Sequence, residues 1–248
     1  MKKYLIINAD DFGLSTGVNR AIGELHQAGV VSSTTVMVNM PGFKEAIALA
    51  RQCPALGVGL HFNLGYGTPI CPSRQVASLV NQNGYFSQQA DNWKENEVEL
   101  ELEAQWRRLV DAGIRPTHID SHQFVQCYYP VFRPLVKLCQ REKLPLRRVP
   151  GEPLLNLRRP PAADYSLLDT YFDGNGKERL RKNLESLRPG VTELMCHPAY
   201  VDDTLISISS WTLVREEELR VFADSDLPPL IKQLDINLIH YGQIKFFR

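Results

Sequence analysis

The chain has 248 residues, 44% of them hydrophobic, and its 28 lysines and arginines are balanced by 28 aspartates and glutamates. This composition supplies a large core and excludes a disordered chain, and the zero net charge gives no basic field for nucleic acid or a membrane surface. The five cysteines are odd in number and include no CxxC pair, which argues against a disulfide framework or a structural zinc site. Asn8 interrupts the apolar start, so we expect no signal peptide or membrane span and a soluble, cytoplasmic protein.

Apolar runs and helix signals alternate along the chain, which predicts an α/β fold with parallel strands. The predicted strands cover 4–7, 30–38, 57–62, 117–120, 145–149, 191–196 and 236–240. The predicted helices cover 16–28, 41–50, 94–112, 130–142, 177–187, 215–222 and 228–232. Two segments, 63–91 and 150–172, are expected to be irregular. The number of repeats favours a barrel over an open sheet, with one domain spanning 1–248.

Four polar clusters follow predicted strands. They are Asp10-Asp11, His61, Asp120-Ser121-His122 and His197. The carboxyl ends of parallel strands share one face, so these side chains are expected to converge. One carboxylate and two imidazoles form a ligand set for a divalent metal, and Asp11, His61 and His122 could supply it.

Each of these residues has a simpler explanation when it is taken alone. Adjacent aspartates often form turns or cap helices, and His61 could be a core histidine bonded to the backbone. His26, His118 and His240 are interpreted as structural. The basic cluster of Arg147, Arg148, Arg158 and Arg159 fits a solvated surface as well as a phosphate site. The four strand-end clusters together nevertheless favour a functional site.

Six segments carry a family resemblance. They are NADDFG at 8–13, SSTT at 32–35, GLHFNL at 59–64, PTHIDSH at 116–122, ELMCHPAY at 193–200 and REEEL at 215–219. In this order they resemble the sequence blocks of the YdjC-like carbohydrate deacetylases, which include the chitooligosaccharide deacetylases. The resemblance spans essentially the whole chain.

The resemblance implies a distorted TIM-like barrel that removes acetyl groups from N-acetylated sugars, often as a homodimer. It implies that Asp11, His61 and His122 hold a divalent cation, which is most often Mg²⁺, with Zn²⁺ or another transition metal as the alternative. Such an ion would lower the pKa of a water molecule and polarise the acetyl carbonyl. By the same resemblance Asp10 is the general base and His197 the general acid.

Further residues are predicted to support these groups. Asp120 could orient a histidine ligand. Phe62, Asn63 and Tyr200, which lie in the matched blocks, are predicted substrate contacts. The irregular segments and their neighbours offer other aromatic residues that could stack on sugar, namely Tyr66, Trp93, Tyr128, Tyr129 and Trp211.

The chain departs from the family pattern after His122. Many members continue with further histidines, whereas this chain has Gln123-Phe124-Val125-Gln126. The departure leaves open a catalytically silent sugar-binding or regulatory protein, and also a metal-dependent hydrolase of another carbohydrate. A glycosidase with paired carboxylates fits less well, because the adjacent Asp10 and Asp11 would diverge. Retention of Asp10 and His197 favours the deacetylase.

Overall fold

Strand β1 (Lys3–Phe12) is the centre of a parallel sheet in the computed structural model, which describes residues 2–246. It pairs along Lys3 to Ala9 with β6 (Gly190–Cys196) on one side. On the other side it pairs first with β7 (Ile236–Leu238), at Lys3 to Leu5, and then with β2 (Ser33–Val36), from Asn8 onward. The residues from Leu5 to Phe12 are buried, as a continuous apolar run in a covered parallel strand requires. The predicted first strand is therefore correct but extends through the aspartate pair.

The described residues form a seven-stranded sheet in which β3 (Gly57–Phe62) and β4 (Ile119–Ser121) follow β2, and β5 (Tyr165–Leu167) follows β6. Isolated hydrogen bonds connect the two edges. Leu146 bridges to Ile119 of β4, and its N–H donates to the carbonyl of Pro161, shortly before β5. The sheet thus curls into a distorted (β/α) barrel, which confirms the predicted fold class.

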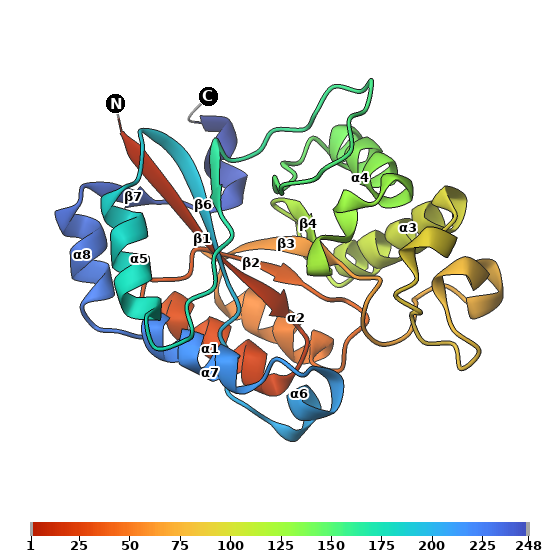
Figure 1. The fold of residues 1–248 in the computed structure, drawn as a ribbon, viewed down its shortest axis with the longest axis horizontal. Coiled ribbons are helices and arrows are strands. Elements are labelled where there is room, and N and C mark those ends of the chain that lie inside the picture. Colours follow the sequence, from red (N-terminus) through yellow and green to blue (C-terminus); the bar gives the residue numbers. More distant parts are fainter. Residues whose placement is uncertain (1, 247–248) are drawn as a thin grey trace.

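Helices surround the sheet (Figure 1), with α3 and α4 beyond β4 and with α5 and α8 beside β6 and β7. They are α1 (Thr16–Gln27), α2 (Phe43–Gln52), α3 (Glu95–Asp111), α4 (Tyr129–Glu142), α5 (Gly176–Glu185), α6 (Asp203–Ile208), α7 (Leu213–Phe222) and α8 (Leu227–Gln233). Helix α1 illustrates how the sequence sets these elements. The Ser15 hydroxyl accepts the N–H of Val18, and Val18, Ile22 and Leu25 are buried on one face.

The predicted strand at 145–149 is wrong. Only Leu146 makes a bridge, because the N–H groups of Leu146 and Arg147 donate to carbonyls on opposite sides, and proline at 145 and 150 has no N–H to extend a ladder. The strand at this edge is instead β5, which lies within a segment expected to be irregular. Helix α6 was also not predicted.

The segment 63–91 contains short 3-10 turns, at η1 (Ser73–Gln75), η2 (Ala77–Leu79) and the start of η3 (Ala90–Asn92), and one isolated antiparallel bridge between Val80 and Phe86. Two further 3-10 segments are η4 (His122–Cys127) and η5 (Tyr241–Phe246). Across residues 2–246, no helix combines the length and the apolar character that crossing a bilayer requires.

Candidate active site

The strand-end clusters converge on one cavity of about 340 Å³. Asp10 and Asp11 come from β1, His61 from β3, His122 from the end of β4, and His197 from the end of β6. The rest of the lining consists of Tyr66, Ser121, Gln123, Phe124, Leu168, Thr170, Met195, Ser209, Trp211 and Arg215. The parallel topology has therefore brought together strand-end residues as far apart in the chain as Asp10 and His197.

A bulge separates the two aspartates. The pairing of β1 with β2 loses its register between Ala9 and Phe12, and Asp11 has a φ of 66°, in the left-handed region. In a regular strand, neighbouring side chains would point to opposite faces. The bulge instead lets both carboxylates reach the cavity while each takes different partners.

Asp11 faces two histidines. Its Oδ1 lies 3.1 Å from Nε2 of His61 and 3.0 Å from Nδ1 of His122. One ligand atom from each of the three residues lies within 4.8 Å of the others. Ligand atoms on one ion are about 3 Å apart when each bond is 2.0–2.1 Å, so this spacing fits a small divalent cation.

The histidines are prepared as ligands in different ways. Nδ1 of His61 lies 2.7 Å from Oδ1 of Asp120, an arrangement that directs Nε2 toward Asp11. The hydroxyl of Thr35 donates to the other Asp120 oxygen at 3.0 Å. Nε2 of His122 is buried and has no hydrogen-bond partner among residues 2–246. The His122 nitrogen that faces Asp11 is Nδ1, and one carboxylate oxygen and two imidazole nitrogens this close together fit a divalent metal.

The pKa shifts match this geometry. Burial alone would raise the pKa of Asp11, but Arg215 and His122 outweigh it and hold the pKa well below its usual range. Burial alone would lower the pKa of His61, but Asp120 and Asp11 raise it to about 10. Burial lowers the pKa of His122. The site therefore offers an ionised carboxylate, a neutral imidazole and a second imidazole whose proton a cation could replace.

Asp10 lies in a buried ion cluster with Arg147. Both of its oxygens accept from the guanidinium at 2.6 Å, and Arg147 also contacts Asp120 at 2.9 Å and Glu193 at 2.7 Å. Burial opposes ionisation of Asp10, but the charge and hydrogen bonds of Arg147 outweigh it and lower the pKa to about 2. A second possible ligand group, Asp10, His61 and Asp120, fits a metal less well because this guanidinium already occupies its carboxylates.

His197 lines the same cavity, close to Asp10. Its Nε2 lies 3.8 Å from Oδ2 of Asp10, and its Nδ1 lies 3.8 Å from Oε2 of Glu218. The Glu218 carboxylate accepts the backbone N–H groups of His197 and Tyr171, both at 2.7 Å. Helix α7 therefore fixes the backbone of His197 at the cavity wall.

Comparison with known families shows where this chain belongs. The family model described as "YdjC-like protein" matches residues 4–233. The chain belongs to the YdjC-like family. It is 42% identical to a carbohydrate deacetylase from Geobacillus stearothermophilus, over 98% of each chain, and 36% identical to one from Thermoanaerobacter pseudethanolicus, over 98% of this chain and all of the relative.

Solved structures agree on the fold. A protein from Enterococcus faecalis, described as a candidate for cellobiose-phosphate cleavage, superposes with a TM-score of 0.89 at 31% identity and covers 98% of this chain and 99% of its own. A family 4 carbohydrate esterase from Streptomyces lividans superposes with a TM-score of 0.54 at 12% identity, over 95% and 91% of the two chains. The second likeness bears on the fold alone.

Three predicted substrate contacts of this YdjC-like chain lie outside the cavity lining. Phe62 is completely buried in the core. Asn63 is buried and organises a turn, because its Oδ1 accepts the N–H groups of Gly65 and Tyr66. Tyr200 donates its hydroxyl to Glu24 at 2.6 Å on the outer side of α1. Among the other aromatic candidates, Tyr66 and Trp211 line the cavity.

Sequence reasoning missed two arginines and one glutamate. Arg147 is fully buried, so the solvated-surface alternative does not hold for it, whereas its neighbour Arg148 keeps a side chain that is 38% exposed. Arg215 lies 2.6 Å from the second oxygen of Asp11, and its Nη1 has no hydrogen-bond partner within the described part of the chain. Arg215 and Glu218 lie in the matched segment 215–219, and their i, i+3 spacing was the available signal for a shared face.

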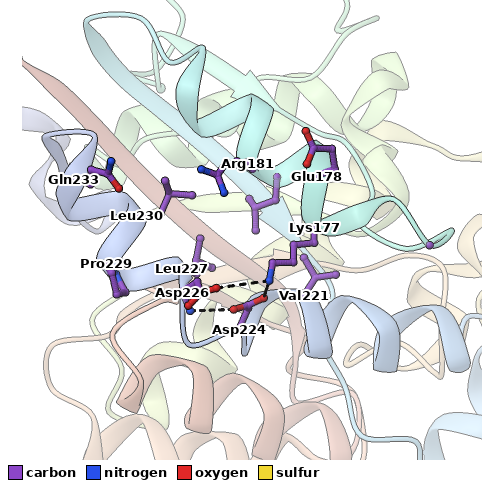
Figure 2. Close-up of a pocket in the computed structure, with 12 residues that line it drawn as sticks. Lys177, Glu178, Arg181, Val221, Asp224, Asp226, Leu227, Pro229, Leu230 and Gln233 are labelled. Atoms are coloured by element: carbon purple, nitrogen blue, oxygen red, sulfur yellow. Dashed lines mark hydrogen bonds and ion pairs between the residues drawn. The ribbon is translucent and has the colours of Figure 1, made fainter.

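A second hollow, of about 540 Å³, lies between α5 and α8 (Figure 2). Its rim carries an exposed Lys177 paired with Asp224, and Asp224 also accepts the N–H of Asp226. No histidine lines this hollow, and its charged groups are solvated, so it lacks the chemistry of the first cavity.

Proposed function

We propose that this chain is a metal-dependent carbohydrate deacetylase that hydrolyses the acetamide of N-acetylated sugars or oligosaccharides. One observation carries the proposal. The group formed by Asp11, His61 and His122 shares a cavity with an ionised Asp10 and with His197, neither of which is needed as a ligand. The printed names of the relatives give the same reaction class.

We propose Asp11, His61 and His122 as the residues that hold the divalent cation, with Asp120 orienting His61. When bound, the cation supplies a Lewis acid that activates water and stabilises negative charge on the acetyl oxygen. Two imidazoles and one carboxylate favour a transition ion such as Zn²⁺ over Mg²⁺ on donor chemistry alone. Mg²⁺, which the resemblance implies, is the alternative that elemental analysis of the purified protein decides.

The remaining groups divide the proton transfers. Asp10, held by Arg147, accepts a proton from the attacking water as the water oxygen bonds to the acetyl carbon. A general base of this kind raises the rate about 10²–10⁴-fold. His197 donates a proton to the sugar nitrogen as the C–N bond breaks, so that an amine leaves instead of an amide anion. The products are acetate and the free amino sugar. Arg215 holds the second oxygen of Asp11 and leaves the first for the cation.

Acetate release from a panel of N-acetylated oligosaccharides tests this function, with and without a chelator. We expect release that the chelator abolishes and that added metal restores. Release that survives complete metal removal would refute the proposed mechanism. A carboxylate-pair glycosidase would cleave the sugar chain without metal, and a silent binder would retain the sugar without releasing acetate.

We also propose, from the family resemblance, a homodimer in the cytoplasm. Light scattering during size-exclusion chromatography measures the mass directly, and a value near 28.2 kDa, the mass of one chain, would refute the dimer. Fractionation of the native host tests the location.

A further inference from the structure

The turn after β4 holds two successive non-glycine residues in the left-handed region. Gln123 has φ 52° and ψ 27°, and Phe124 has φ 52° and ψ 36°. Side chains of L-residues crowd the backbone in this region, so such residues persist only where their surroundings enforce them.

Hydrogen bonds enforce the turn from both ends. The Ser121 hydroxyl donates to the side chain of Gln126 at 3.0 Å and accepts the Gln126 N–H at 3.2 Å. The buried Gln126 amide then donates to the Arg147 carbonyl and to Glu152, both at 2.9 Å. The preceding residue is the candidate ligand His122. Gln123 and Phe124 are therefore held between the candidate ligand His122 and the hydrogen-bonded Gln126.

The strained turn places Phe124 in the wall of the cavity, half-buried. The same cavity is lined by Trp211, which is 42% exposed. The indole is braced by edge contacts with His197 at 6.0 Å and with Phe172 at 5.6 Å between ring centroids. Leu168 and Met195 add apolar surface to the lining. Both rings stay partly exposed in the cavity that His197 also lines, so they offer it an apolar contact surface.

We propose that Phe124 and Trp211 form the sugar-binding platform of this cavity, contacting the apolar C–H faces of the pyranose whose acetamide is hydrolysed, and that the strained turn aims Phe124. This inference rests on the proposed deacetylase function. Aromatic rings provide a large, rigid contact area, and the cavity volume lies at the small end for ligand sites, which suits one sugar ring with its acyl group. The predicted contacts Phe62, Asn63 and Tyr200 do not line this cavity.

The test compares metal-loaded Phe124→Ala and Trp211→Ala with the conservative variants Phe124→Tyr and Trp211→Phe. Tyr129→Ala is the matched control, because Tyr129 is 55% exposed near the same turn but does not line the cavity. The readouts are kcat and KM for an N-acetylated oligosaccharide, and kcat/KM for 4-nitrophenyl acetate, an acetyl ester without a sugar. Binding of the deacetylated oligosaccharide is measured by calorimetry.

We expect each alanine variant to raise KM for the sugar roughly three- to tenfold, the range for one aromatic contact. The specificity ratio of sugar to ester falls by the same factor, the conservative variants restore most of it, and the calorimetric Kd rises in parallel. Unchanged KM and Kd in both alanine variants would overturn the platform, as would equal losses for sugar and ester. Failure of the wild type to release acetate, with sugar binding that still depends on Phe124, would overturn the proposed function and leave the platform standing.

Discussion

Replacement of Arg147 by methionine tests whether the buried ion cluster is as tightly coupled as its distances indicate. Arg147 has no exposed surface and makes contacts of 2.6 to 2.9 Å with three carboxylates, those of Asp10, Asp120 and Glu193. Methionine fills a similar volume but leaves these carboxylates without their shared cation. Glu193, whose pKa is already raised by burial, would take up a proton and relieve part of the repulsion.

Removing one partner of a buried ion pair costs about 3–5 kcal/mol, because the remaining charge stays desolvated. We expect the free energy of unfolding at pH 7 to fall by that amount. A typical domain has only about 5–15 kcal/mol in total, so Arg147→Met could fail to fold. Arg147→Lys keeps the charge but loses the two-pronged contact with Asp10, and it should lose about 1.5–3 kcal/mol, the value of hydrogen bonds to a charged group.

Urea denaturation followed by circular dichroism measures these losses. Arg148→Met is the matched control, since its contact with Glu152 is 3.9 Å long and its side chain is 38% exposed; we expect a change within about 0.5 kcal/mol. The reasoning is refuted if Arg147→Met unfolds within about 1 kcal/mol of the wild type, or if the two neighbouring substitutions cost the same.

Three further predictions concern the cavity. Asp10→Asn should retain metal in elemental analysis and lose about 10²–10⁴-fold in kcat, and a near wild-type rate would remove Asp10 as the base. His122→Ala should weaken metal affinity by at least tenfold in a chelator competition, and unchanged stoichiometry and affinity would exclude it as a ligand. Gln123→Gly should raise the Tm, because glycine adopts a φ of 52° without strain and the gain is about 1 kcal/mol; a lower Tm would show that the turn is relaxed.

The strand-end rule explains what the sequence could predict. Asp11, His61 and His122 each follow or end an apolar run, and the parallel arrangement brings such positions to one face whatever their separation. The same rule could not separate the roles of Asp10 and Asp11. That separation depends on a bulge and on one left-handed residue, and strand periodicity carries no information on either.

The predicted strand at 145–149 failed for a related reason. Its apolar and basic pattern places the segment correctly beside β4, but one bridge at Leu146 is all that forms. Tertiary contacts prevent a longer ladder, because the N–H of Leu146 donates to Pro161 and the N–H of Arg147 donates to Ile119. Arg147 is fully buried in this segment, so a residue in a basic run is the most buried arginine of the site.

The charges that complete the site come from outside the strand ends. Five buried carboxylates, those of Asp10, Asp11, Asp120, Glu193 and Glu218, are matched by only two buried guanidinium groups, those of Arg147 and Arg215. Buried charge is costly unless it is compensated, so this surplus of carboxylates favours a further positive charge in the cluster. The raised pKa of His61 is one response to that surplus, and a divalent ion between Asp11 and the two histidines is a stronger one. Both the charge balance of the whole cluster and the three candidate ligands therefore favour a metal at this site. The ligands could be predicted from the sequence, whereas the charge balance depends on residues such as Arg147 and Glu218 that the sequence pattern did not reveal.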